Sequence, residues 1–423
     1  MLYFGLLASF VLEYVRPGSY LPVITALKLN TLVPLLVFVV ALYSTQKFTN
    51  RDVFDHRNSR WLALFVGLMF VSLTHADVTF NTFEVIKMVF GYLFLCFAVA
   101  KLVDSNERLK GFALTLVLSH VALVALNPDV VLRPEVRTYL QGVTFLGDGN
   151  DFGLSVVVAA PLCLYLFLDT DKKFYRLLAL GLVGVMLFSI IGTSSRGASL
   201  AITAVFVYLW WRGRSKMLGL LAFVALGVAL LIYAPDEYFG RMETIANYEE
   251  EGSAMGRIHA WKAALRMAGD HPVLGVAVGH FPIKYGVEYR PPEYAGLNMP
   301  WHTAHSIYFL VLGELGLPGI IFLLGLLYGN YRSGERIIKR VRTIREHSPL
   351  ARRYERTFLC LNSSLIGFAV GGAFLSALYY PHLYVISALY IAAELRYRRD
   401  EALMFPEHAA ATDESAATVG QTA

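Results

Sequence analysis

Long apolar segments recur along almost the whole chain, and they restrict its fold more than any other feature of the sequence. Counting about 17–25 residues as one crossing of a bilayer, we distinguish a series of candidate membrane-spanning segments. The twelve segments cover residues 2–14, 21–43, 61–74, 83–103, 111–126, 152–168, 174–192, 197–211, 216–234, 306–328, 358–379 and 381–395. They are continuous and do not alternate, which disfavours a β-barrel. We therefore predict an all-α, polytopic membrane helical bundle of about twelve spans.

The composition agrees with a membrane protein. Charged residues make up 16% of the 423 positions, whereas a soluble domain carries about 25%. Cys96, Cys163 and Cys360 all lie inside apolar segments, so we expect buried core residues and neither a zinc site nor a disulfide framework. No cleavable signal is evident, because the N-terminus lacks a basic region before its first apolar segment.

Lysine and arginine are distributed unequally over the loops. With the N-terminus in the cytoplasm, 25 of the 37 basic residues fall in loops on the cytoplasmic side, nine of them between Arg332 and Arg356. The positive-inside rule predicts this arrangement. The long loop 235–305 then lies on the opposite side of the membrane. The net charge of +5 is explained by this distribution, so we expect no nucleic-acid partner.

The same assignment divides the chain into four regions. They are an N-terminal membrane bundle (1–234), a large non-cytoplasmic loop (235–305), C-terminal membrane helices (306–399) and a disordered cytoplasmic tail (400–423). Within the loop, residues 257–268 predict an amphipathic helix with Ile258, Trp261, Leu265 and Ala268 on one face. Such a helix suits the membrane surface above a cavity. No internal repeat is evident, which disfavours an inverted-repeat transporter.

Two polar turns on the non-cytoplasmic side could carry chemistry. The sequence Gly-Asp-Gly-Asn-Asp at 147–151 includes Asn150 and Asp151, and its simplest interpretation is a turn that caps the following helix. The sequence Gly-Thr-Ser-Ser-Arg-Gly at 192–197 carries one charge, Arg196. That arginine suits either a snorkelling side chain at the interface or an anion site built from exposed amides and a guanidinium fork.

The large loop adds two further candidates. Arg257 stands at the start of the predicted amphipathic helix, where it is either a solvated loop residue or part of an anion site. His302, His305 and Ser306 stand where this loop meets the next apolar segment. Ionisable groups at such a boundary are expensive unless they are paired or functional. A metal site needs three or four ligands, and no acidic or cysteine partner is evident nearby, so we predict no metal.

Taken together these stretches resemble the O-antigen ligase family, within the bacterial polysaccharide ligase and polymerase superfamily. The central match is His305-Ser306 followed after nine residues by Gly316 and then by Gly319. The turn at 193–197, the stretch from Gly256 to Trp261, the segments 271–276 and 279–281, and the turn at 149–152 also resemble the family.

This resemblance implies a bundle of the membrane glycosyltransferase type in the bacterial inner membrane. It implies a glycan donor on undecaprenyl diphosphate at the periplasmic face and no cofactor. His305 would be the catalytic base, and Arg196 and Arg257 would hold the diphosphate. His302, Ser306, Asn150 and Asp151 are possible supporting residues.

The chemistry is compatible with these roles. A glycan diphosphate is already activated, and two guanidinium forks can offset the charge of the departing diphosphate without a metal. Attack at the anomeric carbon by an acceptor hydroxyl would invert its configuration. The acceptor stays open: lipid A–core, a protein or another glycan. A repeat-unit polymerase and a lipid-linked glycan flippase without chemistry remain alternatives.

Overall fold

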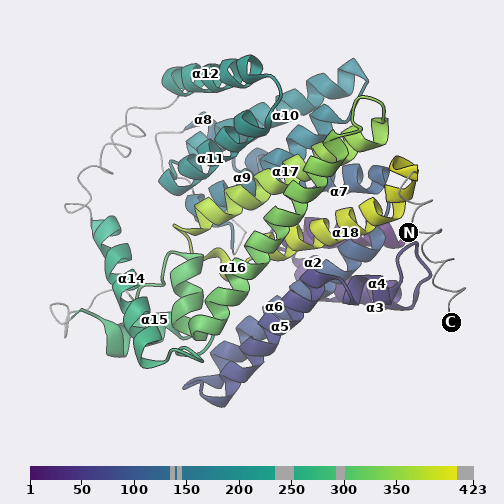
Figure 1. The fold of residues 1–423 in the computed structure, drawn as a ribbon. Coiled ribbons are helices and arrows are strands. Elements are labelled where there is room, and N and C mark those ends of the chain that lie inside the picture. The colour runs from purple at the N-terminus through teal and green to yellow at the C-terminus, as the bar shows by residue number, and fades with distance from the viewer. Residues whose placement is uncertain (134–138, 141–144, 234–251, 292–300, 407–423) are drawn as a thin grey trace, which may run out of the picture.

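The computed structural model describes residues 1–133, 139–140, 145–233, 252–291 and 301–406. This part of the chain is built from helices joined by short turns, and it contains no β-strand beyond the single bridge between Tyr139 and Asp148. The predicted all-α fold is therefore confirmed. Figure 1 shows the helices as a packed bundle with one smaller group, α14 and α15, beside the start of α16.

The helices of the N-terminal half follow the apolar segments closely. Their bounds are α1 (Leu2–Tyr14), α2 (Pro22–Ala26), α3 (Leu29–Tyr43), α4 (Asn50–Phe54), α5 (Arg57–Val71), α6 (Thr79–Leu102), α7 (Asn106–Leu126), α8 (Asp129–Leu132), α9 (Gly149–Leu168), α10 (Lys173–Gly192), α11 (Arg196–Arg212) and α12 (Lys216–Tyr233).

The remaining elements complete the bundle and the large loop. They are α14 (Gly252–Asp270), α15 (Phe281–Lys284), a π-helical turn η4 (Tyr285–Tyr289), α16 (Ile307–Arg342), α17 (Pro349–Gly372), a short 3-10 turn η6 (Ala377–Tyr379) and α18 (Pro381–Met404). Short turns η1 (Pro17–Ser19) and η2 (Ser72–Thr74) lie in the N-terminal half. Each of the twelve predicted segments coincides with at least one helix.

Five helices of the described chain are long and apolar enough to cross a membrane by length and composition: α6, α7, α9, α10 and α16. The apolar helices α1 and α3 are shorter. The fold is thus that of an all-α membrane protein, while the count of about twelve crossings remains a prediction. The proposed tail lies mostly outside the described residues, although α18 continues to Met404.

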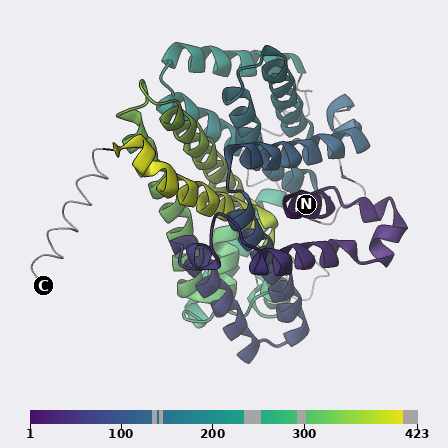
Figure 2. The same ribbon diagram turned by 90° about the vertical axis from the view of Figure 1, so that its right-hand side faces the viewer.

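Helix α17 lies at the centre of the bundle and contacts α16, α9, α11 and α18 (Figure 1). Small residues allow the close approach to α9, because a Cβ at Gly367 would lie 2.7 Å from Val157. Helix α18 joins the two halves of the molecule by packing against α6 as well as α17 (Figure 2). Helix α12 lies at the periphery, where its main contact is α11.

The predicted amphipathic helix is present, but its buried face differs from our prediction. Helix α14 packs against α16 and buries Ala260, Ala263, Ala264 and Met267, whereas Leu265 is 56% exposed. Three alanines allow α14 to lie close to its neighbour, which side chains as large as Leu265 would prevent. The prediction identified the larger apolar residues and missed the stripe of small ones.

Candidate active site

A polar cavity of about 650 Å³ lies where the turns before several helices meet. Its lining residues are Asp148, Asn150, Asp151, Thr193, Ser194, Arg196, Gly197, Gly256, Arg257, His302, Thr303, His305, Leu375, Ser376 and Tyr380. The structure therefore brings together six of the seven residues singled out in the sequence, from segments separated by more than 100 positions. The seventh, Ser306, is buried beside the cavity and does not line it.

The cavity is built at the N-terminal ends of helices. Asp148 is the N-cap of α9, Ser195 the N-cap of α11, Ser306 the N-cap of α16 and Tyr380 the N-cap of α18. Helix N-termini carry partial positive charge and unsatisfied N–H groups, so they favour anions. Four such ends at one cavity, together with Arg196 and Arg257, make it suited to a phosphate-bearing ligand.

His305 is held in an unusual backbone conformation. Its φ is +47°, in the left-handed region that a histidine rarely adopts. Such strain, of order 1–3 kcal/mol, persists where the surrounding structure imposes it, often at functional sites. Ser194, on the Arg196 turn, shows the same feature with φ of +49°. Among the described residues, two of the five non-glycine residues with positive φ, Ser194 and His305, therefore line one cavity.

The environment of His305 favours the neutral imidazole. Burial, the guanidinium of Arg257 and the neighbouring His302 lower the pKa of His305 to about 4, while Asp148 opposes this effect. A neutral imidazole can accept a proton, whereas imidazolium cannot. Burial, and next the charge of Arg257, thus keep the side chain of His305 in its basic form at neutral pH.

His302 lies beside His305, with 6.4 Å between their ring centroids. Its ring also packs edge-to-face against that of Tyr285, with 5.7 Å between the ring centroids. Gly256 lies close to the same ring, because a Cβ at Gly256 would lie 3.6 Å from His302 Nε2. Burial, with smaller contributions from Arg290 and His259, lowers the pKa of His302. The described residues include no group of three or more His, Cys, Asp or Glu side chains that could hold a metal.

The turn at 148–151 serves the structure of α9 first. The backbone N–H and the side-chain amide of Asn150 both donate to Asp148 Oδ1, at 2.8 and 2.7 Å. This is the capping interaction that the sequence favoured. Asp151 accepts a hydrogen bond of 3.3 Å from the hydroxyl of Tyr380. Asp148 therefore caps α9 by accepting from Asn150, while Asp151 links α9 to the start of α18.

The second half of the histidine motif connects the large loop to α16. Gly316 has φ of +65° and breaks the helical geometry of α16. The N–H of the next residue, Leu317, donates to the carbonyl of Pro272 at 2.8 Å, and Val276 N–H donates to Gly313 at 2.9 Å. A Cβ at Gly316 would lie 2.6 Å from that Pro272 oxygen. Gly316 thus lets the end of the Arg257 helix dock on the His305 helix.

Buried Glu314 strengthens this junction. Its carboxylate accepts the backbone N–H of Phe281 at 2.9 Å and the hydroxyl of Tyr379 at 2.5 Å. The large loop, α16 and the turn before α18 are therefore tied together two residues before Gly316.

Sequence reasoning missed the contribution of the turn before α18. Ser376 and Tyr380 line the cavity, and Ser376 Oγ lies 2.9 Å from Thr303 Oγ1. The predicted topology places this turn on the same side of the membrane as His305. The hydroxyl groups of Ser376 and Tyr380 could therefore have been recognised as candidates from the sequence.

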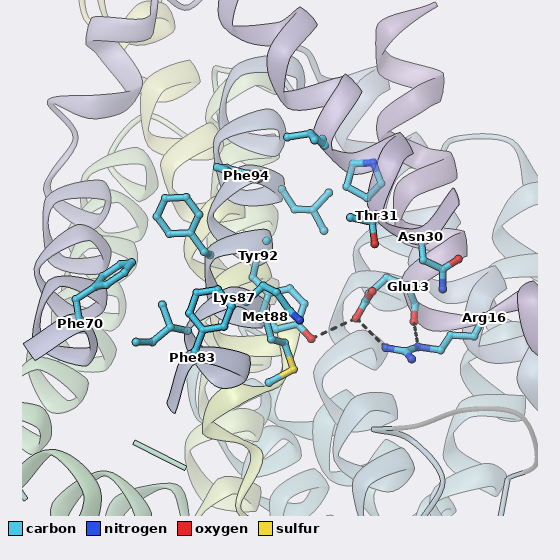
Figure 3. Close-up of a pocket in the computed structure, with 16 residues that line it drawn as sticks. Glu13, Arg16, Asn30, Thr31, Phe70, Phe83, Lys87, Met88, Tyr92 and Phe94 are labelled. Carbon is cyan, nitrogen blue, oxygen red and sulfur yellow. Dashed lines mark hydrogen bonds and ion pairs between the residues drawn. The ribbon is translucent and has the colours of Figure 1, made fainter. Parts of the chain in front are cut away.

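A second cavity, of about 470 Å³, lies between α1, α3, α5 and α6. Figure 3 shows that Phe70, Phe83, Phe94 and Met88 form much of its wall, with Glu13 and Arg16 paired at one end. Tyr92 donates to Glu13 at 3.2 Å, so these polar groups satisfy one another. This cavity contains none of the predicted site residues, and its wall is mainly apolar.

Comparison with known sequences agrees with the motif. Residues 181–324 match the sequence model of the O-antigen ligase family. The chain carries an O-antigen ligase domain. The matched segment contains Arg196, Arg257, His302 and His305, and it ends within α16 after the motif glycines. No curated protein matches the chain. The resemblance seen in the sequence is confirmed, and the O-antigen ligase domain indicates a membrane enzyme of the ligase or polymerase type.

Proposed function

We propose that this O-antigen ligase-type protein transfers a glycan from undecaprenyl diphosphate to an acceptor hydroxyl at the periplasmic face of the bacterial inner membrane. The observation that carries the proposal is the convergence of His305, Arg196 and Arg257 on one cavity at the N-terminal ends of helices. A base and two cations are the groups that this reaction requires.

In the proposed reaction, the imidazole of His305 takes the proton of the acceptor hydroxyl as its oxygen attacks the anomeric carbon. A new C–O bond forms on the face opposite the diphosphate. The bond between the anomeric carbon and the diphosphate oxygen breaks, and its electron pair leaves with the diphosphate. The configuration is inverted, and cleavage of the donor's glycosyl–diphosphate bond supplies the driving force.

Arg196 and Arg257 would bind the diphosphate before and during its departure. A guanidinium presents two parallel N–H donors that match phosphate oxygens, and it stays charged at any physiological pH. The N-terminal ends of α11 and α16 add partial positive charge at the same place. These groups would stabilise the leaving diphosphate without a metal ion.

The location of the polar groups favours chemistry over passive transport. A transporter places its polar residues near the middle of the bilayer. Here most of the cavity-lining residues lie in the turns before α9, α11, α16 and α18 or in the first turn of these helices, so they gather at one end of the bundle. That placement suits a donor whose lipid stays in the bilayer and an acceptor that arrives from water.

The proposal is tested by transfer from purified undecaprenyl-diphosphate glycan in detergent, with and without a chelator. Wild-type protein should form product equally well in both. Loss of transfer on chelation, restored by a divalent cation, would overturn the metal-free mechanism. The product also separates the two family reactions: a longer lipid-linked chain indicates a polymerase, and transfer to a different acceptor indicates a ligase.

A further inference from the structure

A third cavity lies far along α16 from the active-site residues and is strongly basic. It has a volume of about 490 Å³ and is lined by Arg212, Arg332, Glu335, Arg336, Lys339 and Arg342. Five of these six lining residues are cations. All but Arg212 lie on α16, and Arg212 is the last residue of α11.

The carboxylates nearby neutralise only part of this charge. Glu335 pairs with Arg212 at 2.6 Å, and Arg342 pairs with Glu355 at 2.7 Å. Arg332 donates to the hydroxyl of Tyr328 at 2.7 Å. Within the described part of the chain, Arg332, Arg336 and Lys339 have no carboxylate partner. Three exposed cations that pair with no carboxylate of the described chain therefore line this cavity, and its one carboxylate, Glu335, is paired with Arg212.

The basic residues continue an apolar stripe on the same face of α16. Ile321, Leu324 and Tyr328 are 61%, 49% and 59% exposed. With Arg332, Arg336 and Lys339 they recur at intervals of three or four residues, which places all six on one face of the helix. The stripe thus changes from apolar to basic between Tyr328 and Arg332.

The length of the apolar part matches one leaflet. Eleven residues separate Ile321 from Arg332, a rise of about 16 Å along an α-helix at 1.5 Å per residue. Half the hydrocarbon thickness of a bilayer is about 15 Å. An acyl chain lying along Ile321 and Leu324 would therefore bring its headgroup phosphate to the level of Arg332 and Arg336.

We propose that this cavity binds the headgroup of an acidic phospholipid whose chains lie along the apolar stripe. The continuity of the stripe with the cavity favours a lipid over a free phosphate, because a small soluble anion would make no contact with the exposed apolar residues. Tyr328 and Arg332 would mark the interface, as aromatic and basic side chains do in membrane proteins. Basic pockets of this kind recognise acidic headgroups.

The test is a lipid titration of the full-length protein in neutral detergent, read by native mass spectrometry. Dioleoyl phosphatidylglycerol and dioleoyl phosphatidylcholine share their chains and differ in headgroup charge. We expect phosphatidylglycerol to be retained at the lower concentration. The double substitution Arg336→Gln and Lys339→Gln should weaken its binding by about 30-fold, at about 1 kcal/mol per basic residue and 1.4 kcal/mol per tenfold.

The matched control is Lys172→Gln with Lys173→Gln, which removes the same charge from two exposed lysines outside the cavity. It should bind phosphatidylglycerol as wild type does. Each single substitution, Arg336→Gln or Lys339→Gln, should weaken phosphatidylglycerol binding about fivefold. The single variants can therefore be measured instead if the double variant is unstable.

Three outcomes would overturn the proposal. Equal retention of the two lipids would show that headgroup charge is not recognised. Equal binding by the double variant and its control would remove Arg336 and Lys339 from the site. Displacement of phosphatidylglycerol by inorganic phosphate or glycerol phosphate at similar concentration would show that the ligand is a soluble anion. None of these outcomes bears on glycan transfer at His305.

Discussion

The indole N–H of Trp261 donates a 2.9 Å hydrogen bond to the carbonyl of Ala304, the residue before His305. The Trp261 ring also stacks on Phe309, with centroids 5.1 Å apart and planes 15° apart. Helix α14, which carries Arg257, thus contacts the chain on both sides of His305. This relationship explains how a non-glycine residue is kept at φ of +47° next to a cavity.

We predict that Trp261→Phe lowers the rate of transfer about fivefold. Phenylalanine keeps the ring stack and loses the hydrogen bond, whose net worth is about 1 kcal/mol. The donor KM should not change, because the diphosphate groups are untouched. Trp301→Phe is the control: Trp301 is 55% exposed and does not line the cavity. A Trp261→Phe enzyme with wild-type kcat would show that this bond does not position His305.

Arg196→Ala and Arg257→Ala should each reduce transfer by about 100-fold or more, because a charge-assisted contact to phosphate is worth about 3 kcal/mol. Lysine at either position should rescue poorly, since it lacks the planar fork. Lys262→Ala, on the exposed face of the same helix as Arg257, is the control and should be near wild type. Transfer and donor binding should be measured together. Full activity in either alanine variant would remove that arginine from the site.

The pH dependence of transfer should reflect the depressed pKa of His305. Because that pKa is about 4 in the free protein, the imidazole stays neutral as the pH falls from 7 to 5. The acid limb of kcat/KM should therefore lie well below pH 6.5, the usual histidine value. Arg257→Gln removes a positive charge that lowers the pKa of His305. The residual activity of this variant should therefore fall off at a higher pH than that of wild type.

The same shift affects stability. The unfolded chain binds a proton near pH 6.5 and the folded chain only near pH 4, so His305 destabilises the fold increasingly as the pH falls through this window. His305→Asn should therefore lose less stability than wild type between pH 6.5 and 4. Thermal unfolding in detergent at several pH values measures this. An equal loss in both proteins would contradict the assigned pKa.

Backbone strain at His305 predicts a difference between two variants at this position. Alanine at φ of +47° remains strained, whereas glycine does not. His305→Gly should unfold at a higher temperature than His305→Ala. Relief of backbone strain adds about 1 kcal/mol to its free energy of unfolding, and the greater chain entropy of glycine offsets part of this gain. Both variants should transfer about 10²–10⁴-fold more slowly than wild type. Identical unfolding temperatures would mean that this turn relaxes when the histidine side chain is removed.

Gly316→Ala should disrupt the junction between the large loop and α16. The added Cβ would lie 2.6 Å from the Pro272 oxygen at a positive φ, so the loop must move. We expect lower stability and lower transfer, measured on the purified protein. Gly184→Ala is the control, because a Cβ there has nothing within 4 Å and lies inside a helix. Equal behaviour of the two variants would show that the break at Gly316 is unimportant.

The sequence predicted most of the helices because apolar segments and helix boundaries are local features. It also singled out Arg196, Arg257, His302 and His305, which line one cavity, since charged and imidazole groups stand out against an apolar background. It did not predict the buried stripe of α14, because alanines give a weak apolar signal. Nor did it predict the role of Tyr380, whose approach to Asp151 depends on how α18 packs against the rest of the bundle.

Helix lengths were the other weakness. Helix α16 extends to Arg342, well past the apolar segment that ends near residue 328. The basic residues after Tyr328 lowered the local hydropathy without ending the helix, because lysine and arginine are good helix formers. The predicted loop at 332–356 is therefore helical over most of its length.

The central claim is that His305 is the base of a glycan transfer from a lipid diphosphate. The most direct test is a single-turnover reaction with purified undecaprenyl-diphosphate glycan, comparing wild type with His305→Ala and measuring donor binding in the same samples. We predict that His305→Ala binds the donor normally and transfers about 10²–10⁴-fold more slowly, whereas His302→Ala loses much less. Transfer by His305→Ala at the wild-type rate would contradict the account.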